Sequence, residues 1–479
     1  MSESSTTVQK KAPVSFGKAV LVFAATFACL LLGIIQFGTS AHMPLVIATG
    51  IAAIVGVTSG YKWSEMEDGM SETIKASAPA ILIMLIIGMV IGTWILGGIV
   101  PTMIYYGLTW LSPSIFLLAS CLLCALVSTF TGSSWSTMGT IGVALVGVGQ
   151  GLNVPLGMTV GAIISGSYFG DKMSPLSDTT NLAPAMAGTD VFTHVKHMMY
   201  TTTPSFCTAL IIYAVMGFTV VGDSADMNTI QVYLDTLSQH FDITPIMLIP
   251  PICVLLMVVF KVPAIPGLIG VAFLGGIFGI VFQGESLTNI LAATYTGVSM
   301  DVGVDTINTL LNRGGLSSML DTIALILIAL AFAGVVESTG MVHSIVAKLQ
   351  SFAKTDKGVM TTAVFATLFC NFATGAQYVA LVLPGRMFRE TFRERHLHPK
   401  NLSRILEDVG TVCAPFCPWS TDAVYILGTL GATTSQYAPF MFFAMLSPIM
   451  SLVCIWTGWT IKYMTPEEEQ TLAEHGKVT

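Results

Sequence analysis

The sequence predicts an all-α polytopic membrane protein made of two inverted repeats, each with a re-entrant hairpin and a broken transmembrane helix. Hydrophobic residues make up 53% of the 479 positions, and charged residues only 10%. A soluble protein of this length needs more charge to cover its surface. Apolar runs of about 20 residues, long enough to cross a bilayer, recur in two similar series along the chain.

The apolar runs divide the chain into two repeats, 15–222 and 243–464, joined by an external connection at 223–242. In the first repeat, the runs lie at 18–37, 43–60, 79–100, 113–130 with 135–150, 154–190 with a break, and 199–220. In the second, they lie at 243–260, 264–283, 318–340, 358–373 with 376–388, 401–435 with a break, and 438–462.

The less hydrophobic parts of the chain are predicted to lie outside the bilayer core. Stretches at 61–78 and 284–317 are candidate interfacial helices, since each lies between the second and third runs of its half. The polar ends predict a disordered N-terminus at 1–14 and a cytoplasmic tail at 465–479.

The spacing of landmark residues supports an internal repeat. Gly132 lies 43 residues before Pro175, and Gly375 lies 43 residues before Pro418. Pro204 follows Pro175 by 29 residues, and Pro448 follows Pro418 by 30. If the paired segments around the two glycines are hairpins that enter and leave by one face, each half crosses five times. An odd number of crossings makes the two halves inverted.

Basic residues agree with this topology when the N-terminus is inside. The connection from Gly222 to Asp242 contains four aspartates and no lysine or arginine, which is the pattern expected for a loop outside the cell. Arg313 is the one basic residue that this topology clearly places outside. We interpret the arginine-rich loop from Arg386 to Arg404 as a topology determinant, with no nucleic acid as partner. The basic positions that fall inside are Lys62, Lys75, Lys196, Lys261, Lys348, Lys354, Lys357, this loop and Lys462.

The hairpin tips and the helix breaks are the predicted binding site. Glycine relaxes the backbone at a tip, and proline frees carbonyl groups at a break. Carbonyls, hydroxyls and carboxylates are hard oxygen ligands suited to Na⁺, while half-helix N-termini favour an anionic group. The candidate cation- and proton-binding residues are Thr131, Ser133, Ser134, Ser174, Ser177, Asp178, Thr179, Asn181, Thr374, Gln377, Ser420, Thr421 and Asp422.

Asp178 and Asp422 occupy nearly equivalent positions, offset by one residue. We predict both as Na⁺ ligands and Asp178 also as a proton carrier, because desolvation of a buried carboxylate favours its protonated form. The alternative is an N-cap for the following half-helix.

Neighbouring charges have alternative roles. Lys172, next to Asp171, either competes with a cation for a carboxylate or pairs with one for structure. Glu407 and Asp408 follow the arginine-rich loop and are expected to pair with it.

The run GDKMSPLSDTTN from Gly170 to Asn181, with its continuation to Asp190, closely resembles the NhaC family of bacterial sodium/proton antiporters. This resemblance covers nearly the whole chain. It implies exchange of cytoplasmic Na⁺ for external H⁺. We expect this exchange across the bacterial inner membrane, with both termini in the cytoplasm, as the basic residues indicate, and with no cofactor besides the transported ions. The resemblance also implies inverted repeats, an elevator-like movement and a homodimer.

The same sequence features leave three other functions open: carboxylate exchange, a passive channel and an enzyme. Some members of the family resemble malate/lactate antiporters, which couple carboxylates to Na⁺. Neither hairpin tip has an arginine to clamp a carboxylate, although helix N-termini and hydroxyls can substitute for one. A passive channel differs because it cannot drive Na⁺ uphill. An enzyme is disfavoured, since no metal cluster or nucleophile–base pair occurs among the spans.

Overall fold

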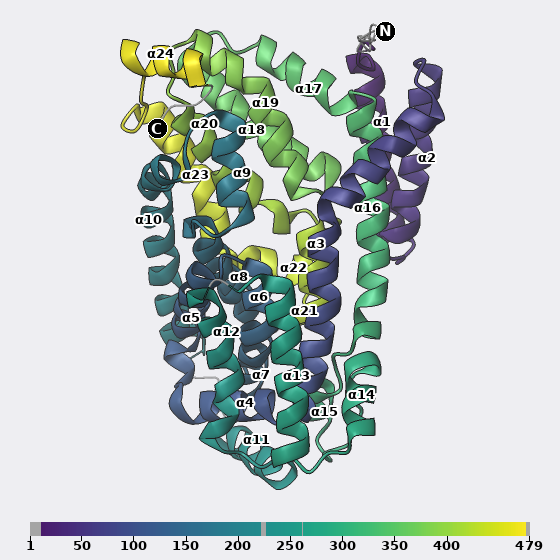
Figure 1. Ribbon diagram of the computed structural model, residues 1–479, viewed down its shortest axis with the longest axis vertical. Helices are drawn as coiled ribbons and strands as arrows, with labels where there is room; N and C mark the ends of the chain where they lie inside the picture. The colour runs from purple at the N-terminus through teal and green to yellow at the C-terminus, as the bar shows by residue number, and fades with distance from the viewer. Residues whose placement is uncertain (1–10, 222–226, 261, 476–479) are drawn as a thin grey trace, which may run out of the picture.

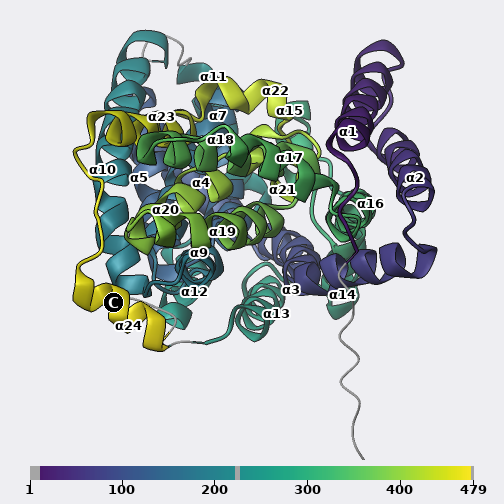
Figure 2. The same ribbon diagram turned by 90° about the horizontal axis from the view of Figure 1, so that it is seen from above.

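The computed structural model describes residues 11–221, 227–260 and 262–475. These residues form helices and connections, with one isolated bridge between Leu397 and Tyr463 and no strand. Most helices run along the long axis, and the first and last described residues lie at the same end of the molecule (Figure 1). Seen from above, α1 and α2 lie at one side of the bundle and α10 at the opposite side (Figure 2). The predicted all-α class is confirmed for the described residues.

The helices of the first half lead to a hairpin and then to a broken helix. They are α1 (Phe16–Leu31), α2 (His42–Thr58), α3 (Trp63–Leu96), α4 (Ile99–Trp110), α5 (Pro113–Thr131), α6 (Ser134–Thr137), α7 (Val143–Gly151), α8 (Leu156–Met173), α9 (Asp178–Ala187) and α10 (Val191–Met216).

The rest of the chain follows a similar order, with a π-helical turn, η6 (Leu406–Thr411), directly after α20. Its α-helices are α11 (Met227–His240), α12 (Ile249–Val259), α13 (Ala264–Phe282), α14 (Leu287–Thr296), α15 (Asp305–Leu311), α16 (Leu320–Ser338), α17 (Met341–Ser351), α18 (Asp356–Thr374), α19 (Gln377–Glu394), α20 (Pro399–Ile405), α21 (Thr421–Leu430), α22 (Thr434–Tyr437), α23 (Phe442–Thr457) and α24 (Pro466–His475).

The length and composition of the helices make this a multi-pass membrane protein. Among the described residues, six helices are long and apolar enough to cross a membrane, and a bent pair that includes α23 brings the number to seven. The breaks leave other apolar stretches in shorter pieces, such as α8 and α9, on either side of residues 174–177.

The two segments expected as interfacial helices are helical, with other bounds than the sequence suggested. Residues 61–78 do not form a separate helix, because α3 continues through Pro79 for 34 residues. The Thr73 hydroxyl donates to the Leu330 carbonyl at 2.9 Å, which ties the first part of α3 to α16. Residues 284–317 form the two short helices α14 and α15.

The ends and the connection are only partly described. Lys11 pairs with Glu65 at 2.7 Å, and the Val14 amide donates to the Thr339 carbonyl, so residues 11–14 lie against the protein and differ from the predicted disorder. The predictions for residues 1–10, 222–226 and 476–479 lie outside the described residues. The rest of the connection forms α11, at the end of the molecule opposite the termini (Figure 1).

The hairpins and broken helices of the two halves match closely. Helices α5 and α18 each have 19 residues, and α9 and α21 each have 10. Ser177 and Ser420 cap the N-termini of α9 and α21, and Gly188 and Gly431 end them in the left-handed conformation. All these pairs are 243 residues apart, as are Gly132 and Gly375.

Each hairpin tip rests on the break of its own half. Gly132 and Gly375 both have a φ of 63°. A Cβ on Gly132 would lie 2.8 Å from the carbonyl carbon of Leu176, and one on Gly375 would lie 2.9 Å from the carbonyl oxygen of Trp419. Only glycine allows both this conformation and this contact.

Alanine at either tip is therefore expected to destabilise the protein. The left-handed conformation alone costs about 1–2 kcal/mol for a residue with a Cβ, and the overlap with the break adds to this. Thermal unfolding of Gly132→Ala and Gly375→Ala in detergent measures the loss. Gly50→Ala in α2 is the control, because a Cβ there has nothing within 4 Å. Melting temperatures equal to that of the control would contradict the tip packing.

Candidate functional site

A buried carboxylate at the second break joins the two halves. Asp422, the second residue of α21, is fully buried. It accepts hydrogen bonds from the Tyr168 hydroxyl of α8 and, at 3.2 Å, from Nε1 of Trp135 at the first hairpin. Tyr425 stacks on Trp135 at 4.4 Å between ring centroids and donates to its carbonyl at 2.6 Å. Asp422 is thus held by polar groups of the opposite half.

Asp178 lies in a different environment from Asp422. It is the first residue of α9 and is exposed, whereas burial was expected. The N-cap of α9 is Ser177, so the alternative role as N-cap does not apply to Asp178 either. Because one residue turns a helix by about 100°, the offset of one position directs the two carboxylates differently. The residue that matches Asp422 at the 243-residue interval is Thr179.

Asp171 connects the end of α8 to the first hairpin. Its side chain is nearly buried, at 7% exposure. Its Oδ2 accepts from the Ser134 amide at 3.1 Å and from the Ser134 hydroxyl at 2.7 Å. Both donors are neutral, so the hydrogen bonds leave the charge of a carboxylate uncompensated.

Lys172 and Asp408 form a buried ion pair between the halves. Both side chains have an exposure of 0%. The Lys172 ammonium also donates to the Ser447 hydroxyl at 3.0 Å, and the Thr201 hydroxyl donates to Asp408 at 2.9 Å. Nε of Arg404 lies 3.9 Å from Asp408. Of the two alternatives for Lys172, pairing with a carboxylate is the one observed. Arg404 is the residue of the arginine-rich loop that forms an ion pair with Asp408 within the part of the chain that the structure describes.

Glu407 is a buried carboxylate that was expected to pair with the basic loop. It lies in η6 with an exposure of 0%. Its Oε1 accepts from the Thr179 hydroxyl of α9 at 3.0 Å, while Oε2 has no hydrogen-bond partner among the described residues. The repeat itself predicts burial here, since Glu407 matches Ile164 in the middle of an apolar run.

The remaining candidates mainly fix the shape of their own half. Thr131 and Ser133 bond within the first tip, and Ser420 caps α21 while donating to the Ala414 carbonyl at 2.8 Å. Gln377 donates to the Thr411 carbonyl at 3.3 Å, across the second half. The full set with bonds inside its own half is Thr131, Ser133, Ser174, Ser177, Asn181, Thr374, Gln377, Ser420 and Thr421.

The buried charges around the breaks do not balance. Among the described residues, four carboxylates and two basic side chains, apart from histidines, are buried. Both bases lie at Asp408, so the other three acids have no ion pair within 4 Å. No three His, Cys, Asp or Glu side chains of the described residues are placed to hold one metal ion. The buried acids are Asp171, Glu407, Asp408 and Asp422, and the bases are Lys172 and Arg404.

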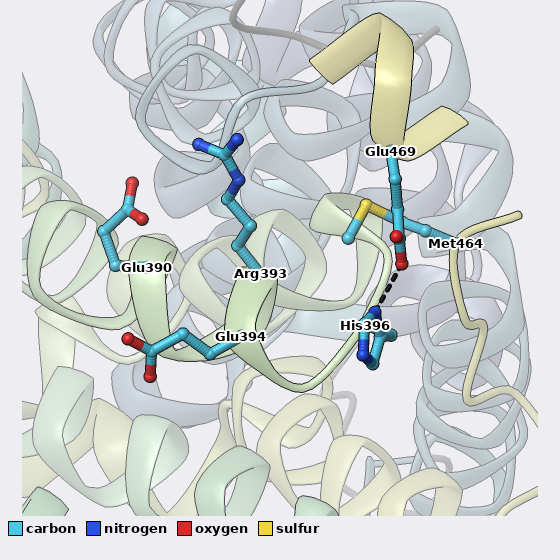
Figure 3. A pocket seen from close by; sticks show the side chains of 6 residues that line it. All are labelled: Glu390, Arg393, Glu394, His396, Met464 and Glu469. Carbon is cyan, nitrogen blue, oxygen red and sulfur yellow. Dashed lines mark hydrogen bonds and ion pairs between the residues drawn. The ribbon is translucent and has the colours of Figure 1, made fainter. Parts of the chain in front are cut away.

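A surface pocket lies apart from these residues, at the end that carries both termini. Figure 3 shows its lining from the end of α19 and from the chain around α24. Nδ1 of His396 lies 2.5 Å from Glu469, and this contact ties α24 to the turn after α19. The pocket is lined by Glu390, Arg393, Glu394, His396, Met464 and Glu469.

Comparison with known proteins gives a consistent result. The model of the Na⁺/H⁺ antiporter family matches residues 166–459, which include both breaks and the second hairpin. The chain is 35% identical to the malate-2H⁺/Na⁺-lactate antiporter of Bacillus subtilis over 94% of its length and 97% of the relative.

Two further relatives have a similar identity. The Na⁺/H⁺ antiporter NhaC of Alkalihalophilus pseudofirmus is 35% identical over 94% of this chain and 97% of its own. The arginine/ornithine antiporter ArcD of Halobacterium salinarum is 36% identical over 95% of this chain and 94% of its own. The three relatives carry the names of antiporters with different substrates.

Proposed function

The chain belongs to the Na⁺/H⁺ antiporter family, and from this premise we propose that it is a secondary active antiporter, not an enzyme, that exports Na⁺ in exchange for H⁺. The observation that carries the proposal is the surplus of two buried carboxylates over buried bases. An uncompensated buried charge costs several kcal/mol. A cation or a proton must therefore neutralise these acids, and competition between the two couples their movements.

In this proposal Asp422 is the central carrier, and Asp178 receives the cation. Asp178 is exposed at the N-terminal end of α9, where a hydrated Na⁺ can reach it. Asp422 is buried and held only by neutral donors, so it accepts either a proton or Na⁺. The hydroxyls and carbonyls of the tips and breaks supply further oxygen ligands, and no cofactor is required.

The proposal includes the membrane arrangement. The matched hairpins, broken helices and tip glycines support two inverted repeats with re-entrant hairpins. Both described ends of the chain lie at one end of the molecule (Figure 1), which fits cytoplasmic termini in a bacterial inner membrane. A homodimer remains part of the proposal because of the family resemblance.

The alternative is Na⁺-coupled exchange of small carboxylates by the same scaffold. Relatives of equal identity named for malate and lactate or for arginine and ornithine support it. The N-termini of α9 and α21 favour an anionic group. Against this, each half-helix carries an acid within its first two residues, Asp178 or Asp422, which repels a carboxylate.

Flux assays distinguish these functions. Purified protein is reconstituted into liposomes that are acidic inside and contain a pH-sensitive dye. Addition of NaCl outside is expected to collapse the pH gradient without an organic solute, whereas choline chloride at the same ionic strength does not. If the gradient collapses only when malate, lactate or arginine is supplied, the ion-only function is wrong. A channel would fail to accumulate Na⁺ against its gradient.

A further inference from the structure

Among the three buried acids without an ion pair, Glu407 has an oxygen left to bind a ligand. Asp171 accepts two hydrogen bonds from Ser134 on Oδ2, and its Oδ1 is not among the buried side-chain atoms of the described residues that have no hydrogen-bond partner. Asp422 accepts on both oxygens, from Tyr168 and Trp135 on one and from Thr421 on the other. Oε2 of Glu407 is buried and has no hydrogen-bond partner among the described residues.

The surroundings of Glu407 supply further oxygens, and no basic side chain of the described residues forms an ion pair with it within 4 Å. Thr179 holds Oε1 at 3.0 Å. Thr411, later in the same π-helical turn, lies beside the carboxylate. Its hydroxyl is also buried and has no hydrogen-bond partner of regular geometry among the described residues. These two buried oxygens lie beside one another, yet neither makes a hydrogen bond of regular geometry among the described residues, which indicates room for a ligand between them.

The backbone here also departs from a regular helix. Residues of η6 form a π-helical turn. Such turns are rare in proteins, and many of those that occur lie at functional sites. Asn371 of the second hairpin donates to the carbonyls of Val409 and Gly410 at 3.1 and 2.9 Å, so the turn is fixed from outside. The hairpin therefore helps to fix the position of Glu407.

We propose that Glu407, Thr179 and Thr411 form a second cation-binding site, occupied in turn by Na⁺ and by a proton. A carboxylate and hydroxyls are the hard oxygen ligands that suit a small alkali cation. The ligands come from both halves, because Thr179 lies in α9 and Glu407 and Thr411 lie in η6. Its role in transport rests on the proposed function, whereas cation binding is a property of the site itself.

Binding of radioactive Na⁺ to the purified protein in nanodiscs tests the proposal without any transport. At alkaline pH, Glu407→Gln is expected to bind one Na⁺ per chain fewer than the unchanged protein, and acidification is expected to displace that ion. The control is Glu394→Gln, the same chemical change at an exposed position at the end of α19. The proposal is overturned if Glu407→Gln binds as many ions as the control with equal affinity.

A second variant covers a failure of Glu407→Gln to fold. Thr179→Val keeps the carboxylate and removes one oxygen ligand, so it is expected to weaken Na⁺ binding several-fold at one site only. Unchanged binding by a folded Thr179→Val protein also overturns the proposal. If binding depends on Glu407 but the liposomes show no Na⁺-driven proton flux, the site stands and the antiport function fails. If Na⁺-driven proton flux occurs and Na⁺ binding does not depend on Glu407, the antiport function stands and the proposed site at Glu407 is wrong.

Discussion

Replacement of Asp422 by asparagine is expected to abolish Na⁺-driven proton exchange and leave the protein folded. Asparagine has nearly the same shape, and its carbonyl oxygen can still accept from Tyr168 and Trp135. It cannot exchange a proton for Na⁺, because the amide carries no charge. Proton flux in dye-loaded liposomes should fall to the level of vesicles without protein, while the melting temperature stays close to that of the unchanged protein.

Asp321→Asn is the matched control for this experiment. It makes the same chemical change in the first turn of α16, where the Asp321 side chain is 91% exposed. Its flux is expected to equal that of the unchanged protein. Normal exchange by a folded Asp422→Asn protein would remove Asp422 from the mechanism and leave the other buried acids as carriers.

Removal of one member of the buried ion pair is expected to have the largest effect on stability. Lys172→Met leaves the Asp408 carboxylate buried with Arg404 at 3.9 Å as its nearest base. Breaking a buried pair in this way costs about 3–5 kcal/mol of unfolding free energy. Thermal unfolding and the fraction of monodisperse protein in detergent measure the loss.

The double variant Lys172→Met with Asp408→Asn separates charge from packing. It removes both charges, so no anion remains buried without its lysine, and it is expected to be more stable than Lys172→Met alone. Such a recovery is the non-additive result that interacting residues give in a double-mutant cycle. Losses that simply add would show that Lys172 and Asp408 do not interact in the folded protein.

Sequence patterns predicted much of the fold because the features involved are local or periodic. Apolar runs predicted the helices, and the glycines and prolines predicted where hairpins turn and helices break. The stretch at 61–78 is helical as expected, but it is the first part of α3. Its polarity suggested a separate helix, but its close packing against α16, through contacts such as that of Thr73 with Leu330, keeps α3 continuous.

The candidate site was predicted only in part because side-chain direction depends on single residues. Asp178 and Asp422 look equivalent in the sequence, yet the offset of one residue leaves one exposed and the other buried. Glu407 was assigned to the basic loop because it follows that loop closely in the chain. Its match with Ile164 at the 243-residue interval would have indicated a buried position. Tyr168 and Trp135, which donate to Asp422, and Thr179, which donates to Glu407, come from the opposite half and leave no trace in the local sequence.

The polar contacts across the halves restrict how the protein can open to either side of the membrane. Pulling the two broken helices apart would separate Tyr168 from Asp422, Lys172 from Asp408 and Thr179 from Glu407. Each separation would break a polar contact of a buried acid, and loss of the Lys172–Asp408 ion pair alone costs about 3–5 kcal/mol. Access of ions to the site by separation of the two broken helices is therefore unfavourable. If the protein transports as proposed, we expect the two hairpins and both broken helices to move together relative to the other helices.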